Sequence, residues 1–266
     1  MLRDITIGQY FPGNSIIHRL DPRFKIIMTV LYIIMLFAGG TYIALAIGAV
    51  YTIIAVALSR IKPKMFVKSI KPIMPFLVIT ALINLLLIGT GDIVWQWKFL
   101  KITDVGINTS VFMILRIILL ITGTSILTYT TSPITLTDAI ERLLSPLKKL
   151  KFPVHELAMM MSIALRFIPT LIEETDKIMS AQKARGAEID SGSFMTRARN
   201  LVSILVPLFI SSFRRADELA TAMECRCYNG GAGRTRLRQL RSSARDYIAL
   251  AVTIVFLAAA IILSKI

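Results

Sequence analysis

Two arginines that stand between small residues are the side chains of this sequence best suited to bind a partner. One lies in the triplet Ala184-Arg185-Gly186 and the other in Cys225-Arg226-Cys227. A guanidinium group is planar and always charged, and it offers a fork of donors to a carboxylate or to backbone carbonyls. Small neighbours let the backbone of a partner approach closely. The triplets therefore predict a pair of docking contacts.

Each triplet ends a long helical pattern, over about residues 154–187 and 196–227, and each pattern contains one proline, Pro169 or Pro207. Two similar arms favour two similar docking surfaces, and hence a dimeric or pseudo-dimeric partner. The alternative is that both arginines only cap their own helices, because a cation is favourable at a helix C-terminus. The sequence leaves both interpretations open.

Other residues that carry chemistry stand alone. Cys225 and Cys227 are too close in sequence for an unstrained disulfide and lack a third ligand at a zinc spacing, so we expect free thiols and no metal. His18 and His155 belong to no catalytic arrangement that the sequence indicates, and we expect structural roles for both. The Gly-x-x-x-x-Gly-Lys-Ser/Thr phosphate loop is absent from the sequence. We expect no catalytic site, no cofactor and no ATP binding through such a loop.

The composition indicates which solvent surrounds these elements. Of 266 residues, 55% are hydrophobic and only 18% are charged. A water-soluble domain cannot bury that much apolar surface, so a lipid bilayer is expected. The net charge of +15 then indicates a bias of basic residues toward the cytoplasmic side rather than nucleic-acid binding.

Five apolar segments are long enough to predict transmembrane helices. An uncharged stretch from Ile26 to Ser59 is too long for one crossing, and Gly39-Gly40-Thr41 divides it into a short first span and a second. Asp21 and Pro22 predict the start of the first helix. The expected spans are residues 26–38, with a start that can reach back toward Arg23, and residues 42–59, 72–88, 107–129 and 247–263. Residues 89–106 between the third and fourth spans are expected to form a loop.

The basic residues agree with one topology. They gather at residues 1–25, 60–71 and 131–245, which five spans place on one side of the membrane. The positive-inside rule makes that side cytoplasmic, which places the N-terminus inside. We also expect no cleaved signal peptide. We expect an N-terminal region with four spans (1–130), a cytoplasmic helical region (131–245) and a last span (246–266).

The cytoplasmic region is helical by its pattern. A short helix over residues 135–150 is expected to break at Pro146, Gly192 is expected to separate the two arms, and Asn229-Gly230-Gly231 is expected to end the second. The prediction is thus an all-α, polytopic membrane protein with about five transmembrane helices and a cytoplasmic region of long amphipathic helices.

Residues 8–25 read Gly-Gln-Tyr-Phe-Pro-Gly-Asn-Ser-Ile-Ile-His-Arg-Leu-Asp-Pro-Arg-Phe-Lys. This stretch and the two arms resemble the transmembrane (T) component of energy-coupling factor (ECF) transporters, the EcfT/CbiQ family. The resemblance runs from Gly8 through the last span. It implies a multi-pass subunit of the cell membrane whose coupling helices dock into two cassette ATPases, and which transmits their motion to a membrane-embedded, substrate-binding S component that takes up a vitamin or metal ion.

By the same resemblance, Ala184, Arg185 and Gly186 contact one ATPase, and Cys225, Arg226 and Cys227 contact the other. The second triplet commonly reads Ala-Arg-Gly in this family. Glycine has no side chain and adopts backbone angles that cysteine avoids, so the sequence leaves the close approach at Cys227 open.

Two other functions remain as alternatives. A self-sufficient secondary transporter or channel needs polar groups at mid-membrane, and the spans offer little beyond Asn84 and Arg116. For Arg116 we expect snorkelling or an internal hydrogen bond. A membrane-anchored module that binds nucleic acid or anionic lipid would use a basic cluster before the last span. The cluster consists of Arg234, Arg236, Arg238, Arg241 and Arg245.

Overall fold

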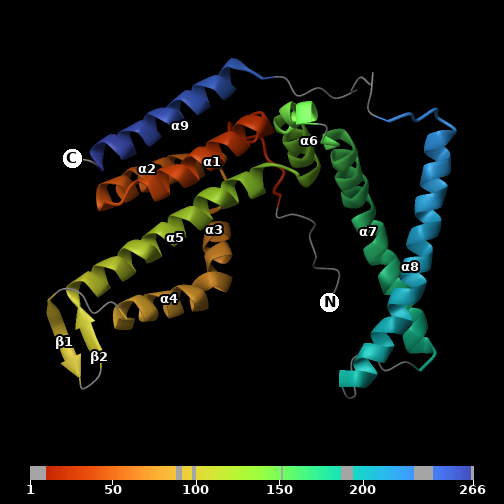
Figure 1. The fold of residues 1–266 in the computed structure, drawn as a ribbon, viewed down its shortest axis with the longest axis horizontal. Helices are drawn as coiled ribbons and strands as arrows, with labels where there is room; N and C mark the ends of the chain where they lie inside the picture. The colour runs from red at the N-terminus through yellow and green to blue at the C-terminus, as the bar shows by residue number, and fades with distance from the viewer. Residues whose placement is uncertain are drawn as a thin grey trace. The chain divides into compact units, whose positions relative to one another are not determined.

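The computed structural model is built almost entirely of helices, as the sequence predicts (Figure 1). It describes residues 10–87, 92–97, 100–150, 152–186, 194–230 and 242–264. The helices are α1 (Pro22–Ala38), α2 (Tyr42–Ser59), α3 (Pro63–Ile70), η2 (Lys71–Ile73), α4 (Met74–Leu87), α5 (Asp104–Thr130), α6 (Pro133–Leu143), η3 (Ser145–Leu150), α7 (Val154–Ala184), α8 (Phe194–Glu224) and α9 (Ala244–Leu263). Two strands, β1 (Ile93–Trp97) and β2 (Leu100–Thr103), complete the described elements.

These elements form two compact units. One contains α1 to α5, the two strands and α9, and the other contains α6, η3, α7 and α8. We describe each unit by itself and call them the helical bundle and the arm unit.

The core of the helical bundle surrounds α1, which packs against α2, α5 and α9. Tyr32 of α1 is 2% exposed and donates a hydrogen bond to the carbonyl of Leu119, while its hydroxyl also pairs with that of Thr52. Glycines permit this close packing, since a Cβ atom at Gly123 of α5 would lie 2.2 Å from the Tyr32 ring. Small residues bring helices together in this way in membranes, where no hydrophobic force drives helices toward each other.

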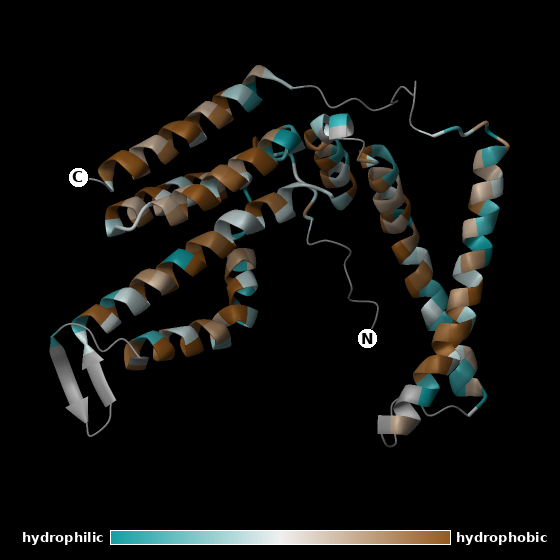
Figure 2. Cartoon of the chain, in the orientation of Figure 1, coloured by the Kyte–Doolittle hydropathy of each residue, from teal (hydrophilic) through white to brown (hydrophobic). Residues whose placement is uncertain are grey.

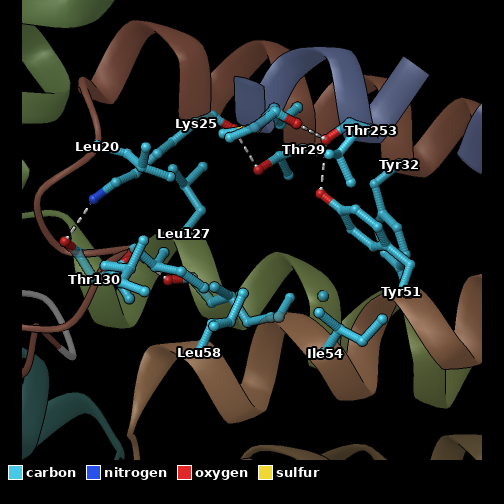
Figure 3. A pocket seen from close by; sticks show the side chains of 18 of the residues that line it. Leu20, Lys25, Thr29, Tyr32, Tyr51, Ile54, Leu58, Leu127, Thr130 and Thr253 are labelled. Atoms are coloured by element: carbon cyan, nitrogen blue, oxygen red, sulfur yellow. Dashed lines mark hydrogen bonds between the residues drawn. The ribbon is translucent and has the colours of Figure 1, made fainter. Parts of the chain in front are cut away.

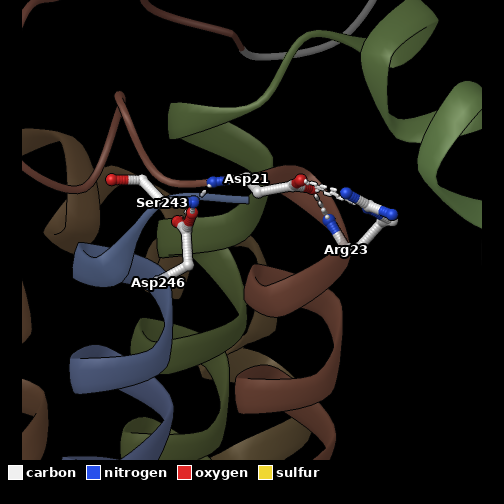
Figure 4. Close-up of polar contacts among 4 residues, drawn as sticks. All are labelled: Asp21, Arg23, Ser243 and Asp246. Carbon is white, nitrogen blue, oxygen red and sulfur yellow. Dashed lines mark hydrogen bonds and ion pairs between the residues drawn. The ribbon is translucent and has the colours of Figure 1, made fainter. Parts of the chain in front are cut away.

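A buried carboxylate joins the first and last helices of the bundle (Figure 4). Asp246 of α9 accepts hydrogen bonds from the backbone N–H of Asp21, at 2.8 Å, and of Ser243, at 2.6 Å. Asp21 is the N-cap of α1, as predicted, and also forms an ion pair with Arg23. The beginnings of α1 and α9 are therefore held together by charge-assisted hydrogen bonds.

A second buried charge closes the end of α5. Lys25 is 4% exposed, and its ammonium group donates to the carbonyl of Thr130 at 3.0 Å and to the hydroxyl of Thr131 at 3.2 Å. A cation at the C-terminus of a helix interacts favourably with the helix dipole. Lys25 therefore ties α1 to the last turn of α5.

Within the described residues, five helical segments are long and apolar enough to cross a membrane, the number that the sequence predicts. However, the five segments are not the same five that the sequence predicts. Helix α1 has 17 residues, about 25 Å, and is not among them, whereas α7 is. The five segments are Tyr42–Ser59, Pro63–Leu86, Asp104–Thr130, Val154–Ala184 and Ala244–Leu263. Figure 2 shows apolar residues along most of α4 and α9, whereas polar residues interrupt α7 and α8.

Two parts of the bundle differ from the expected span and loop. The third span begins before residue 72, because α3 already forms at Pro63, and the chain turns through η2 before α4 continues (Figure 1). Pro72 lies in η2, which agrees with the kink expected of a proline. The predicted loop over residues 89–106 contains the antiparallel pair of β1 and β2, and α5 already starts at Asp104. β-branched and aromatic residues in both segments favour strands.

Of the two structural roles that the sequence left open for Arg116, snorkelling or an internal hydrogen bond, Arg116 has the hydrogen bond. Its guanidinium donates to the carbonyl of Gly39 at 3.1 Å, at the turn between α1 and α2. The same group lies 4.5 Å from the ring centroid of Phe112, a cation–π distance. Arg116 thereby links α5 to the α1–α2 turn, a role in the stability of the bundle.

Candidate functional site

The candidate site is built on the arm unit, where α7 and α8 cross in antiparallel directions. Glu174 of α7 accepts hydrogen bonds from the hydroxyl of Ser211 and, at 2.8 Å, from the guanidinium of Arg215, both on α8. Further along, the side-chain amide of Gln182 donates to the carbonyl of Ser203 at 3.2 Å. As the residue number rises on α7, its partner's number falls on α8, so the two helices run in opposite directions.

The antiparallel crossing places the two arginine triplets at opposite ends of the pair (Figure 1). The end of α7 lies beside the early turns of α8, since Gln182 contacts Ser203. Arg226 follows Ser203 by 23 residues, a helical length of about 35 Å. The two tips are thus far enough apart to occupy two separate binding surfaces.

The first tip has the geometry of a helix C-cap. Arg185 is the C-cap residue of α7, and its N–H donates to the carbonyls of Ala181, at 3.2 Å, and Gln182, at 3.1 Å. Gly186 follows with φ of +83°, and its N–H donates to the carbonyl of Lys183 at 3.0 Å. Glycine is favoured at this left-handed position because it has no Cβ atom.

The second tip closes by the same backbone route although its sequence differs. The N–H of Cys227 donates to the carbonyl of Glu224 at 2.8 Å, and the N–H of Tyr228 donates to the carbonyl of Met223 at 3.0 Å. These two bonds define a Schellman motif, with Arg226 at the C-cap and Cys227 at the left-handed position. Cys227 has φ of +55°. The cysteine therefore adopts the conformation that glycine adopts at the first tip.

The two triplets are thus equivalent in backbone and in exposure. In each, arginine is the C-cap and the next residue is left-handed, and all six residues of the triplets are exposed. A Cβ atom at Gly186 would meet no other atom within 4 Å. Each tip therefore presents a free guanidinium donor fork beside open backbone, which suits a carboxylate or carbonyl acceptor on another molecule.

The two histidines that the sequence singled out have structural contacts. His18 bonds to the hydroxyl of Ser15 at 2.7 Å and to the carbonyl of Phe11 at 2.9 Å, and His155 pairs with Glu141 at 3.1 Å. Both cysteines are free thiols. Among the described residues, no three histidine, cysteine or carboxylate side chains gather as metal ligands would.

Several predictions fall partly or wholly outside the described residues. They include the break at Gly192, the final glycine of the Asn229-Gly230-Gly231 stop, and most of the basic cluster before α9. Of that cluster, Arg234, Arg236, Arg238 and Arg241 lie outside the described ranges, and Arg245 lies inside them.

The residues that hold the crossing in place were not singled out from the sequence. Glu174 and Arg215 are 41 positions apart, and helical periodicity indicates only which residues share a face of one helix. The only signal in the sequence was one of charge. Acidic residues follow the internal proline of the first arm, and basic residues follow the internal proline of the second. Their pairing becomes visible only when the two helices are seen together.

Comparisons with known proteins find the same kind of protein along nearly the whole chain. A family model described as "Cobalt transport protein" (CbiQ) matches residues 13–237. A relative from Ruminiclostridium cellulolyticum, called "Energy-coupling factor transporter transmembrane protein EcfT", is 54% identical over 257 residues, which cover 97% of this chain and 96% of the relative. Proteins of the same name from Clostridium kluyveri and Bacillus subtilis are 54% and 47% identical, with coverage of 94% and 97% of this chain and 93% and 97% of theirs.

Proposed function

The chain belongs to the CbiQ family and is a transmembrane component of an energy-coupling factor transporter, and from that membership we propose that it transmits the motion of two ATPase subunits to a substrate-binding S component. In this proposal the arm unit faces the cytoplasm, residues 131–245 form the coupling region, and the N-terminus is cytoplasmic. The ATPases hydrolyse ATP, and this subunit catalyses no reaction. The S component binds the vitamin or metal ion.

The observation that carries the proposal is the equivalence of the two tips. Arg185 and Arg226 occupy the same C-cap position and stand exposed at opposite ends of one antiparallel pair. Two motor subunits related by a two-fold or pseudo-two-fold axis present two similar grooves, and a pair of matched, separated contacts suits such a partner. The Glu174–Arg215 contact at the crossing sets the relation between the tips.

The experiment compares substitutions at the tips with matched substitutions elsewhere on the arms. In Arg185→Ala with Arg226→Ala, each lost charged contact is expected to weaken ATPase association by about 2 kcal/mol, roughly thirtyfold. The double variant should lose copurification and uptake far more than either single variant. The control is Arg166→Ala with Arg214→Ala, which removes one exposed arginine from each arm outside the tips.

A conservative pair of variants separates docking from capping. Lysine at positions 185 and 226 keeps a cation at each helix C-terminus, but it lacks the planar donor fork. Association should therefore fall in the lysine variants although the helix ends stay intact. Wild-type uptake by the double alanine variant would contradict the proposal, and uptake by this chain with no ATPase present would favour a self-sufficient transporter instead.

A further inference from the structure

We infer that the helical bundle holds an acyl chain of an anionic phospholipid in a groove between α2 and α9 (Figure 3). The groove has a volume of 390 Å³ and is lined by α1, α2, α5, α9 and the segment before α1. That volume is in the range of pockets that hold small ligands, roughly 300–1,000 Å³. The inference depends on the membrane location of the bundle and not on the coupling of the arms to ATPases.

The mouth of the groove is apolar and open toward the surroundings of the bundle. Leu58 and Ile54 of α2 are 43% and 45% exposed, and Ile248 of α9 is 64% exposed. Both α2 and α9 are segments able to cross a membrane, so their outer surfaces face lipid. A groove that opens between two such helices meets acyl chains before it meets any polar solute.

The polar side chains on the interior wall of the groove are already hydrogen-bonded within the protein. Figure 3 shows the groove between the Lys25 end of α1 and the Tyr32–Tyr51 pair, and the hydroxyl groups on its wall already have partners within the protein. The bonded groups on the wall are Lys25 with Thr130, Thr29 with the Lys25 carbonyl, Tyr32 with Thr52, Tyr51 with Thr253, and Thr130 with the Ile126 carbonyl.

A polar ligand such as a vitamin would lose its hydration in this groove without gaining hydrogen bonds, which is unfavourable. An acyl chain has no hydrogen bonds to lose. It would cover the exposed methyl and methylene groups of the wall, so the chemistry of the lining selects a hydrocarbon.

One exposed charge at the end of the groove selects the headgroup. Arg245 is exposed and lines the groove, whereas Lys25, the other cation of the lining, is buried and bonded to Thr130. At this end of α9, the N–H of Ser243 donates to the Asp246 carboxylate and the N–H of Asp246 donates to the carbonyl of Ser243. The Arg245 guanidinium is thus available to a phosphate, to which it can donate two parallel hydrogen bonds.

The test uses the full-length chain in lipid nanodiscs that contain phosphatidylglycerol with a photoactivatable diazirine on one acyl chain. Labelled peptides should map to residues 54–58 of α2 and 248–252 of α9. Ala55→Phe fills the groove and should remove most of this labelling. Ala57→Phe is the matched control, because Ala57 is exposed on the same helix and does not line the groove.

The headgroup is tested with phosphatidylcholine that carries the same diazirine chain. Arg245→Gln should reduce the preference for phosphatidylglycerol by about fivefold, the effect of one basic residue near anionic lipid. Lys68→Gln, at an exposed lysine of α3 outside the groove, should leave that preference unchanged.

Three outcomes would overturn the inference. They are labelling spread equally over the exposed apolar side chains of α4, labelling that Ala55→Phe leaves intact, and crosslinks from the groove to a copurified protein instead of lipid. Ala249→Phe fills the same groove from α9 and replaces Ala55→Phe if that variant does not fold. Even without any variant, the labelling pattern of the wild-type chain shows whether the lipid lies in the groove or is spread over α4. None of these readouts involves an ATPase, so a failure here is distinct from a failure of the proposed coupling function.

Discussion

Replacing Cys227 by glycine is predicted to stabilise the second tip, although the same replacement at Cys225 destabilises it. Cys227 has φ of +55° at the left-handed position of the Schellman motif. Cys225 directly follows α8, and its N–H still makes a helical bond to the carbonyl of Thr221, four residues back, at 3.0 Å. The two cysteines, two residues apart, thus need opposite backbone conformations, left-handed at Cys227 and helical at Cys225.

The magnitude follows from two opposing terms. A left-handed conformation costs a residue with a Cβ atom about 1–2 kcal/mol, and glycine removes that cost. Glycine also gives the unfolded chain more freedom, which costs about 0.5–1 kcal/mol. The net effect of Cys227→Gly is a stabilisation of about 0.5 kcal/mol. At Cys225 only the second term applies, so Cys225→Gly destabilises by about 0.5–1 kcal/mol.

Amide hydrogen exchange is the suitable assay, because the end of a helix opens locally without unfolding the rest of the protein. The amides of Cys227 and Tyr228 donate the two bonds of the Schellman motif. Their protection should rise about twofold in Cys227→Gly and fall about two- to fivefold in Cys225→Gly, at 1.4 kcal/mol per tenfold. Both variants remove one thiol, so the comparison cancels any effect of the sulfur itself.

Equal losses of protection in both variants would refute the assignment of Cys227 to the left-handed position. Gly186 supplies an independent check at the first tip, where φ is +83° and the surroundings are open. Gly186→Ala should lower protection of the α7 end by backbone strain alone. If it does not, the equivalence of the two tips is wrong.

Three further substitutions test the packing that positions the tips and the bundle. Asp246→Ala leaves the buried N–H of Asp21 without an acceptor and should destabilise the chain by about 2–3 kcal/mol, a fall in melting temperature of about 4–12 °C in a thermal scan of the detergent-solubilised protein. Gly123→Ala places a Cβ atom 2.2 Å from the Tyr32 ring and should cost about 1–3 kcal/mol or more in the same scan. Glu174→Ala removes the acceptor at the arm crossing and should weaken it by about 1–2 kcal/mol, which is measured as faster hydrogen exchange or proteolysis in α7 and α8.

Each of these substitutions has a matched control that makes the same replacement, or its closest equivalent, at an open position. Asp217 and Glu173 are exposed carboxylates on the arms, and a Cβ atom at Gly40 would meet no other atom within 4 Å. Asp217→Ala, Glu173→Ala and Gly40→Ala should change stability by less than about 0.5 kcal/mol, or by up to about 1 kcal/mol for the glycine in the stabilising direction. A test variant that behaves like its control would show that the contact assigned to it contributes little.

The sequence was sufficient for features that depend on neighbouring residues. Asp21 and Pro22 predicted the start of α1, and the break expected at Pro146 falls where α6 gives way to η3. The helical arms expected over 154–187 and 196–227 are α7 and α8, with ends within about three residues of the prediction. Hydrophobic periodicity and capping residues act locally, which is why one sequence sufficed.

Features that depend on distant partners were not predictable. Lys25 looked like one more basic residue of the N-terminal segment, and its burial follows from the position of the α5 C-terminus, 105 residues away. The pair of strands in the loop between α4 and α5 depends on pairing between two short segments that are weak signals by themselves. At the site, the arginines were identifiable by their small neighbours, whereas the antiparallel crossing that separates them depends on Glu174, Ser211 and Arg215 together.

The backbone equivalence of the tips restricts what a partner can recognise there. The triplets share no side chain except the arginine, yet Gly186 and Cys227 both adopt the left-handed conformation that ends the helix and exposes the guanidinium. A partner that binds both tips by the same contacts must therefore bind the arginine side chain and the backbone around it. Parallel helices would bring both arginines to one end and to one groove. The antiparallel crossing separates them by about 35 Å along α8, so under the proposed function each tip binds a groove of its own.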